Sequence, residues 1–184
     1  MFNFSQFPVL ETARLRLREI VADDDEAIFA IRGDYEVTKY NIGDAYTDIE
    51  QAQNLIDAMT RLYHEERELR WGITLKGEQT VIGMCGFNYW HRLDKRASIG
   101  FDLNRQHWKQ GIMREALYAI LDFGFNQMKL NRIEADASAA NMASIKLLNS
   151  LNFQQEGIQR EQYFDKGQFY DLLLFGLLRR EWTG

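Results

Sequence analysis

The stretch that decides the fold is WKQGIMREAL, residues 108 to 117, where a single glycine is followed at once by a good helical sequence. Before it, apolar and polar residues alternate from 97 to 104, which predicts a strand. After it, apolar residues recur with helical spacing from 113 to 125. Gly111 is therefore expected between the carboxyl end of a strand and the start of a helix, where open sheets usually bind ligands.

The backbone of this turn has the properties of an anion-binding site. A helix N-terminus leaves about four N–H groups without internal partners and carries about half a positive charge. Lys109, Gln110, Gly111, Ile112 and Met113 supply these groups, and Lys109 adds a cationic side chain. Glycine permits a positive φ and a close approach to a ligand. The turn predicts a phosphate or pyrophosphate cradle, with a plain strand-to-helix turn as the alternative.

The spacing of apolar residues assigns an element to most of the chain. Strands are expected at residues 13–20, 70–75, 80–90, 97–103, 131–137, 161–163 and 169–179, and helices at 24–31, 49–63, 113–125 and 141–151. The stretch 34–46 is expected to be an irregular loop, Thr47-x-x-Glu50 a capping box, and Lys166-Gly167 a turn.

The order β-α-α-β-β-β-α-β-α-β-β predicts an α/β (mixed α+β) fold, with a mixed, mostly antiparallel sheet of about seven strands and flanking helices. The strands on either side of the helix at 113–125 form a natural parallel pair joined by a right-handed crossover. One domain over residues 1–184 is expected from the length.

Composition narrows the class of protein. A net charge of −5 argues against a general nucleic-acid binder. One cysteine excludes an internal disulfide framework, and three scattered histidines show no metal-ligand spacing. The N-terminus lacks the pattern of a signal peptide and no apolar stretch is long enough for a membrane span, so a cytoplasmic protein is expected.

A second stretch, NMASIKLLNSLNF at 141–153, follows the strand expected at 131–137. By itself it predicts an ordinary helix, with Asn141 as N-cap and Ser144 in the first turn. Together with residues 108–113 it completes a series of strand, cradle, helix, strand, Asn-x-x-Ser and helix. This series resembles the GNAT superfamily of acyl-CoA N-acetyltransferases.

The resemblance extends to one branch, the RimJ/RimL type that acetylates the N-termini of ribosomal proteins. The superfamily cradle is Gln/Arg-x-x-Gly-x-Gly/Ala, of which only Gly111 matches strictly. Glu115-Ala116 after the cradle, LETARLRLREI at 10–20 and DKGQFYDLLLFGLLRREW at 165–182 resemble segments of that branch. The resemblance covers nearly the whole chain at matching spacings.

The resemblance implies a GNAT fold and the direct transfer of acetyl from acetyl-CoA to an amine, without a metal. The cradle that holds the coenzyme is then Trp108, Lys109, Gln110, Gly111, Ile112 and Met113. The backbone of Phe101, Asp102 and Leu103 would bind the pantetheine arm and polarise the thioester carbonyl. Asn141 and Ser144 would complete the coenzyme site.

Two positions depart from the superfamily pattern. Asn152 replaces a glycine, and asparagine tolerates the left-handed conformation that this position is expected to need. Leu148 replaces a tyrosine that many members use as a general acid, so Ser144 becomes the first candidate to protonate the departing thiolate.

Several residues are candidates for the base that takes a proton from the acceptor amine, and several amines are candidate acceptors. Candidate bases are Glu134, Asp136, Glu161 and Tyr163, of which Glu134 and Asp136 share one face of a strand. The acidic and tyrosine-bearing loop 34–46 would suit a cationic amine. A protein or peptide N-terminus is the expected acceptor. The alternatives are a small amine, such as an antibiotic or polyamine, and a non-catalytic acyl-CoA-binding module. A homodimer is compatible with an exposed terminal strand.

Overall fold

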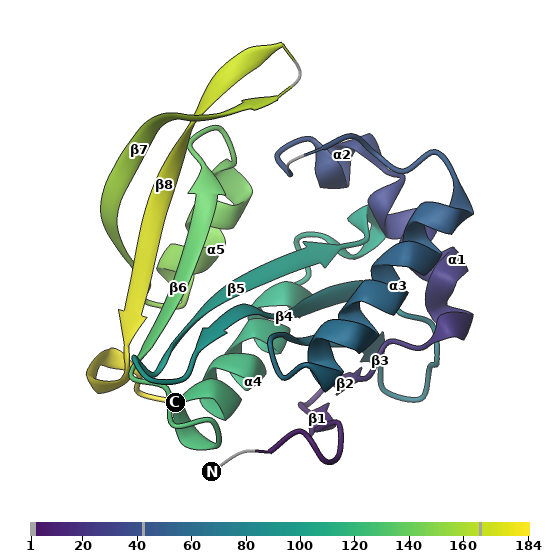
Figure 1. Cartoon of the computed structure of the whole chain (residues 1–184), viewed down its shortest axis with the longest axis horizontal. Helices are drawn as coiled ribbons and strands as arrows, with labels where there is room; N and C mark the ends of the chain where they lie inside the picture. The colour runs from purple at the N-terminus through teal and green to yellow at the C-terminus, as the bar shows by residue number, and fades with distance from the viewer. Residues whose placement is uncertain (1–2, 42, 166) are drawn as a thin grey trace.

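The computed structural model describes residues 3–41, 43–165 and 167–184 (Figure 1). Its strands are β1 (Leu10–Glu11), β2 (Leu15–Arg18), β3 (Leu69–Leu75), β4 (Gly83–His91), β5 (Arg96–Leu103), β6 (Arg132–Ser138), β7 (Gln154–Asp165) and β8 (Gln168–Leu178). Its helices are α1 (Asp25–Arg32), α2 (Tyr35–Thr38), α3 (Ile49–His64), α4 (Ile112–Asn126) and α5 (Met142–Ser150), with 3-10 turns at Ala22–Asp24, Arg105–His107 and Arg179–Glu181. The strands form one sheet in the order β1-β2-β3-β4-β5-β6-β8-β7.

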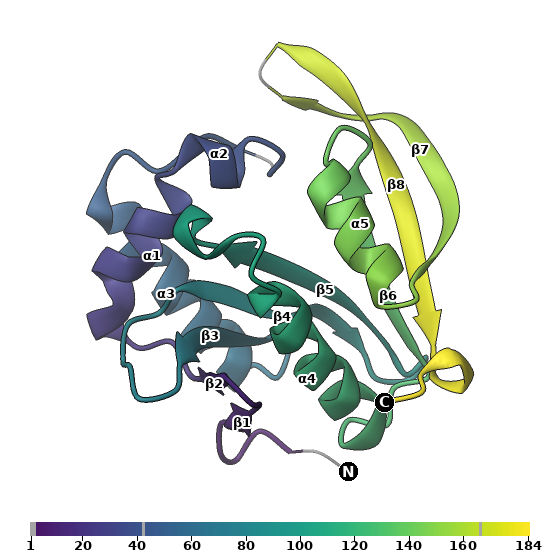
Figure 2. The ribbon, with the colours of Figure 1, turned by 180° about the vertical axis from the view of Figure 1, so that it is seen from behind.

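Helices cover both faces of this sheet. α4 and α5 lie on one face, as the view from behind shows (Figure 2), and α1 and α3 lie on the other. The first face carries the larger apolar core, which includes the fully buried side chains of Trp71, Phe87, Leu117, Phe125, Leu148 and Phe175. The second face carries a smaller core of side chains from α1, α3 and β4. Among the described residues, no helix is long and apolar enough to cross a membrane.

α4 begins where the sequence indicates. Gly111 is its N-cap, with φ of +74°, and the buried residues Met113, Ala116, Leu117, Ile120 and Leu121 form the apolar face predicted from their spacing. Because this face packs on the sheet, the start of the helix is held at the carboxyl end of β5.

β5 and β6 form the expected parallel pair, in a sheet whose other neighbouring strands are antiparallel. The pairing joins Arg96 to Arg132 and ends at Ser98 and Glu134, although both strands continue. Beyond this point the two strands diverge (Figure 1). The carboxyl-terminal half of β5 therefore has a paired strand on its β4 side only, and we call the region between it and the carboxyl-terminal half of β6 the opening.

Several boundaries differ from the sequence expectations. The sheet gains the two-residue strand β1, which is too short to show an alternating pattern, so that eight strands replace the expected seven. The stretch 34–46, expected to be irregular, contains α2, whose N-cap Asp34 accepts a hydrogen bond from the Glu36 N–H. β7 starts seven residues before the expected strand at 161–163, because its polar, exposed residues carry little apolar signal. Of the expected Lys166-Gly167 turn, Lys166 lies outside the described residues.

The capping box of α3 is shifted by one residue from Thr47 and Glu50. Asp48 is the N-cap, its carboxylate accepts from the Glu50 N–H, and Gln51 accepts from the Thr47 and Asp48 N–H groups. Overlapping Thr-x-x-Glu and Asp-x-x-Gln patterns fit the same rule. Sequence alone does not separate them.

Candidate active site

The cradle at the start of α4 presents a row of backbone N–H groups without partners. Among the described residues, none accepts a hydrogen bond from the N–H groups of residues 109 to 114. Ile112 and Met113 are 3% and 7% exposed, so they contribute backbone groups while their side chains pack in the core. Unpartnered N–H groups and the positive end of the helix dipole are what an anionic phosphate requires.

Two residues of the cradle have left-handed backbone conformations, Gly111 with φ of +74° and Lys109 with φ of +60°. At Gly111 an added Cβ would meet only the Arg14 side chain, at 3.6 Å. The expectation of a positive φ is therefore confirmed. The space around the Cβ position allows a side chain, so the requirement for glycine comes from the backbone conformation.

Backbone pairing decides which groups of β5 face the opening. The Asn104 N–H donates to the carbonyl of Ile82, the residue before β4, at 2.8 Å. Because N–H groups alternate in direction along a strand, the Asp102 N–H also faces β4. The N–H groups of Phe101 and Leu103 face the opening instead. The Leu103 carbonyl accepts from the Trp108 indole N–H at 2.8 Å, which fixes the Trp108 side chain over the end of β5. Of the three residues expected to hold a ligand through their backbone, Asp102 is thus turned away.

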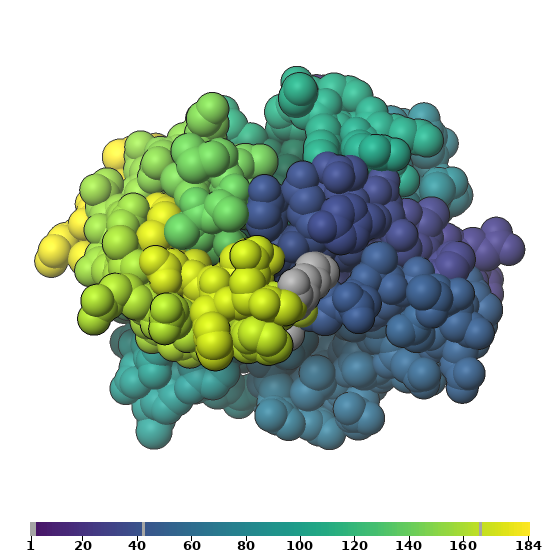
Figure 3. All heavy atoms as spheres, turned by 90° about the horizontal axis from the view of Figure 1, so that it is seen from above, coloured from purple at the N-terminus to yellow at the C-terminus, as the bar shows by residue number. Residues whose placement is uncertain are grey.

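The start of α5 lies on the other side of the opening. Asn141 is its N-cap, as expected, and its side-chain oxygen accepts from the Ser144 N–H at 3.1 Å. The Ser144 side chain is half-buried and its hydroxyl has no partner among the described residues. Viewed from above, the surface is hollowed between the start of α4, in teal-green, and the start of α5, in green (Figure 3). Leu148 is fully buried, so this position offers no proton donor to the opening.

Asp102, near the end of β5, holds one residue of α1 and one residue of the loop 34–46. Asp102 accepts from Arg32 Nη1 and from Asn41 Nδ2, both at 2.9 Å, and Arg32 also lies over the Tyr46 ring. No pattern in the sequence pointed to Arg32 or Asn41, because their partner lies about sixty residues or more away in the chain. The network places this loop beside the opening, on the face of the sheet opposite α4.

The acidic rim expected on this loop is neutralised. Asp34 pairs with Arg105 at 3.1 Å and Glu36 pairs with Lys39 at 2.8 Å. These carboxylates are engaged within the protein, so charge attraction by the loop is weaker than its composition indicates.

Glu134 and Asp136 lie on one face of β6, as expected, but in different environments. Glu134 accepts from Arg96 at 3.1 Å and from Arg132 at 2.7 Å. Asp136 lies two residues beyond the last β5–β6 pair, at the edge of the opening, and no described residue makes a hydrogen bond or ion pair with its carboxylate. The surrounding protein partly desolvates the carboxylate, which raises the pKa of Asp136.

The remaining candidates lie on the β7–β8 hairpin. Tyr163 pairs with Tyr170, and the two rings stack with centroids 5.3 Å apart. Glu161 is exposed, has a φ of +50°, and its N–H donates to Asp171. The tip of this hairpin and α2 lie at the same end of the molecule (Figures 1 and 3).

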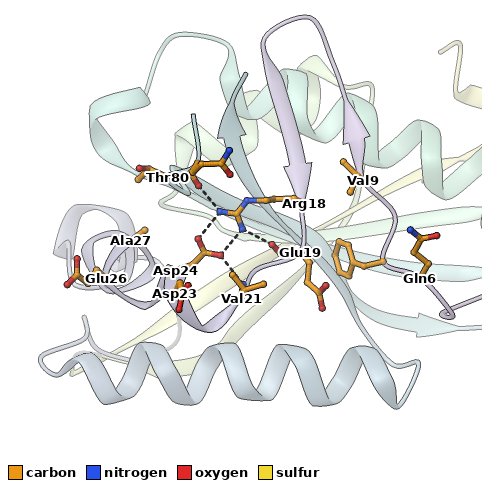
Figure 4. Close-up of a pocket in the computed structure, with 12 residues that line it drawn as sticks. Gln6, Val9, Arg18, Glu19, Val21, Asp23, Asp24, Glu26, Ala27 and Thr80 are labelled. Atoms are coloured by element: carbon orange, nitrogen blue, oxygen red, sulfur yellow. Dashed lines mark hydrogen bonds and ion pairs between the residues drawn. The ribbon is translucent and has the colours of Figure 1, made fainter. Parts of the chain in front are cut away.

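A cavity of about 940 Å³ lies apart from the cradle, between the N-terminal segment, the end of β2 and the start of α1 (Figure 4). Its floor is the ion pair of Arg18 with Asp24, and Arg18 also donates to the carbonyls of Glu19 and Gln79. Because these groups satisfy one another, no described residue presents an unpartnered polar group at the floor of this cavity.

Comparisons with known proteins identify the family of the chain. Residues 14–154 match the family model described as acetyltransferase (GNAT) domain. The uncharacterized N-acetyltransferase p20 of Bacillus licheniformis is 42% identical over 175 residues, which cover 95% of this chain and 98% of p20.

Two solved structures share the fold. The ribosomal-protein-S5-alanine acetyltransferase of Vibrio fischeri superposes with a TM-score of 0.83 at 21% identity, covering 96% of this chain and 100% of that one. RimL, the ribosomal L7/L12 alpha-N-protein acetyltransferase in complex with coenzyme A, gives a TM-score of 0.85 at 18% identity, covering 93% and 98%. With the family match and the identity to p20, these findings show that the chain is an N-acetyltransferase of the GNAT family.

Proposed function

We propose that the protein transfers the acetyl group of acetyl-CoA to the N-terminal α-amine of a protein or peptide within a ternary complex. The row of unpartnered N–H groups at the start of α4, beside the opening between β5 and β6, carries this proposal. These groups would bind the pyrophosphate of the coenzyme. The N–H groups of Phe101 and Leu103 would bind the pantetheine arm and the thioester carbonyl oxygen.

The reaction forms one bond and breaks one. The amine nitrogen attacks the thioester carbonyl carbon, an N–H of β5 stabilises the oxyanion, and the carbon–sulfur bond then breaks. The proton of the amine passes to a base, and the thiolate takes a proton from the Ser144 hydroxyl, which solvent replaces. Asn141 would hold the pantetheine arm or a water molecule beside Ser144.

We assign the base to Asp136 in preference to Glu134. The carboxylate of Glu134 is engaged within the protein, since it accepts hydrogen bonds from Arg96 and Arg132. Asp136 has no such partner among the described residues, so its carboxylate at the edge of the opening is available to take a proton, and partial desolvation raises its pKa. Tyr163 would line the acceptor side, on the hairpin.

The weakness of this base supports an α-amine as acceptor. An α-amino group has a pKa of about 7.7–8.0, and a lysine side chain has a pKa of about 10.4. The free energy of deprotonation of the lysine is therefore about 3.4 kcal/mol higher. A carboxylate, acting directly or through a water, is a strong enough base for an α-amine. It is too weak a base to deprotonate a lysine side chain efficiently. Two proteins of the same fold are named for acetylating ribosomal proteins, which supports the same choice.

The test is the release of free thiol from acetyl-CoA with a panel of acceptors. The panel contains a peptide with a free N-terminus, the same peptide blocked at the N-terminus and carrying a lysine, and a polyamine. The free N-terminus is expected to be acetylated fastest, with mass spectrometry locating the product. Preference for the polyamine would make the protein a small-amine acetyltransferase. Tight binding of acetyl-CoA without release to any amine would make it a non-catalytic module.

The Ser144→Ala variant is expected to slow turnover by at least about tenfold, since a positioned acid contributes that much or more. Coenzyme binding is expected to change little, because the backbone of α5 is unaffected. Ser150→Ala is the matched control, since Ser150 lies at the far end of the same helix and its hydroxyl donates to the Leu147 carbonyl. Equal turnover in the two variants would remove Ser144 from the mechanism.

A further inference from the structure

The segment from Thr12 to Arg14 lies against the start of α4, about a hundred residues away in the chain. Arg14 Nη1 donates to the Gln110 carbonyl at 3.0 Å, and Arg14 Nε donates to Glu115 at 2.6 Å. Glu115 also accepts from the Thr12 hydroxyl at 2.5 Å and from the Arg14 N–H at 2.9 Å. Four hydrogen bonds thus fix one guanidinium and one carboxylate behind the cradle.

The bond to Gln110 has a directional consequence for the cradle. In a trans peptide the carbonyl and the following N–H point in opposite directions, and the peptide after Gln110 is trans. Because the Gln110 carbonyl points at Arg14, the Gly111 N–H points away from it. In the sheet order β3 and β4 lie between β2 and the opening, so an N–H directed away from Arg14 is available to a ligand in the opening.

Without such a contact this peptide has no fixed orientation. Gly111 adopts left-handed and right-handed conformations at similar free energy, and the Gln110 carbonyl has no other partner among the described residues. A rotation of the peptide would turn the carbonyl oxygen, a partial negative charge, toward a bound phosphate.

We propose that Arg14, held by Glu115, is a positioning residue that fixes the peptide between Gln110 and Gly111 with its N–H toward the pyrophosphate of the coenzyme. The inference rests on the proposed function, because it takes the cradle to bind the pyrophosphate. Arg14 acts from behind the turn, through the backbone. Partial burial alone would raise the pKa of Glu115, but the hydrogen bonds from Thr12 and Arg14 outweigh it and lower the pKa below its usual range.

Two substitutions separate positioning from simple charge attraction. Arg14→Gln removes a positive charge, so both mechanisms predict weaker binding of coenzyme A. Glu115→Gln removes a negative charge near the cradle, so charge attraction predicts tighter binding. Positioning predicts weaker binding, because the carboxylate that holds Arg14 and accepts from Thr12 is lost. Arg16→Gln is the matched control, since Arg16 lies two residues further on in β2, is exposed, and has no side-chain partner among the described residues.

The dissociation constants of coenzyme A and of pantetheine, which lacks the pyrophosphate and the nucleotide, are measured for each variant by calorimetry and competition. Arg14→Gln is expected to weaken coenzyme A binding about tenfold, or about 1.4 kcal/mol, and Glu115→Gln to weaken it severalfold. Pantetheine binding and the Arg16→Gln variant are expected to match the wild type. Thermal unfolding is followed in parallel.

Equal losses for both ligands would mean that the contact only supports the fold, and would overturn the proposal. Tighter coenzyme A binding by Glu115→Gln would overturn it in favour of charge attraction. Unchanged binding by Arg14→Gln would overturn it while leaving the proposed function intact. Wild-type protein that fails to bind coenzyme A would instead overturn the proposed function, and this inference with it.

Discussion

The Gly111→Val variant is expected to bind coenzyme A more than about tenfold more weakly than the wild type, a loss of at least about 1.4 kcal/mol. Gly111 has a φ of +74°, and a left-handed conformation costs about 1–2 kcal/mol for residues other than glycine. The strain is largest for a β-branched residue such as valine. The backbone of the turn is therefore expected to change conformation, so that its N–H groups no longer point to the same site. Calorimetric titration with coenzyme A measures the loss.

Gly111→Asn is the matched control for this prediction. Asparagine tolerates the left-handed region, and this chain already places Asn152 there, with φ of +65°. The added Cβ meets only the Arg14 side chain at 3.6 Å, so neither variant introduces a clash in the core. Asn is therefore expected to retain most of the affinity. Similar affinities for Val and wild type would show that the conformation of Gly111 is irrelevant to coenzyme binding.

The Asp136→Asn variant is expected to lose about a hundredfold or more in turnover, the usual contribution of a positioned base. Coenzyme binding should stay near the wild-type value, because Asp136 alternates along β6 with Ala135 and Ala137 of the larger core and so lies on the face of the sheet opposite α4 and α5. Steady-state kinetics with the best acceptor of the panel, together with calorimetry, separates the two effects. Glu134→Gln is the comparison, and its turnover is expected to remain close to wild type, since Glu134 is engaged by Arg96 and Arg132.

The pH dependence provides a second readout of the same residue. Asp136 must be ionised to accept a proton, so kcat/KM is expected to fall as the pH falls through its raised pKa. This acidic limb should disappear in Asp136→Asn. Because the folded-state pKa is raised, protonated Asp136 favours the folded state at low pH and the stabilisation is lost as pH rises through the folded pKa. At neutral pH the Asn variant is therefore expected to be at least as stable as wild type.

The opposite pattern would reassign the base. If Glu134→Gln abolished turnover and Asp136→Asn did not, Glu134 would be the base despite its two arginine partners. An acidic limb that persists unchanged in Asp136→Asn would also exclude Asp136. Unfolding by heat, recorded at two pH values for each variant, separates these outcomes from a general loss of structure.

Short-range patterns explain why so much of the fold is readable from the sequence. The alternation before Trp108 and the helical spacing after Gly111 are local properties, and they predict β5, α4 and the turn between them. The crossover rule then gives the parallel pairing of β5 with β6 without any knowledge of contacts. The start of β7 was not predicted, because its residues are polar and exposed. The cap of α3 was placed one residue too early, because two capping-box patterns overlap there.

The sequence by itself therefore determined the turn at the start of α4, the position of its glycine and the cap of α5, because each depends on residues within a few positions of one another. Only the tertiary structure decided which carboxylate is engaged and which is not, since Glu134 and Asp136 look alike until Arg96 and Arg132 are placed. It also decided that the Asp102 N–H faces β4 and that Arg14 contacts the Gln110 carbonyl. Such contacts join residues far apart in the chain, and their hydrogen-bond geometry exists only once the sheet has brought these residues together.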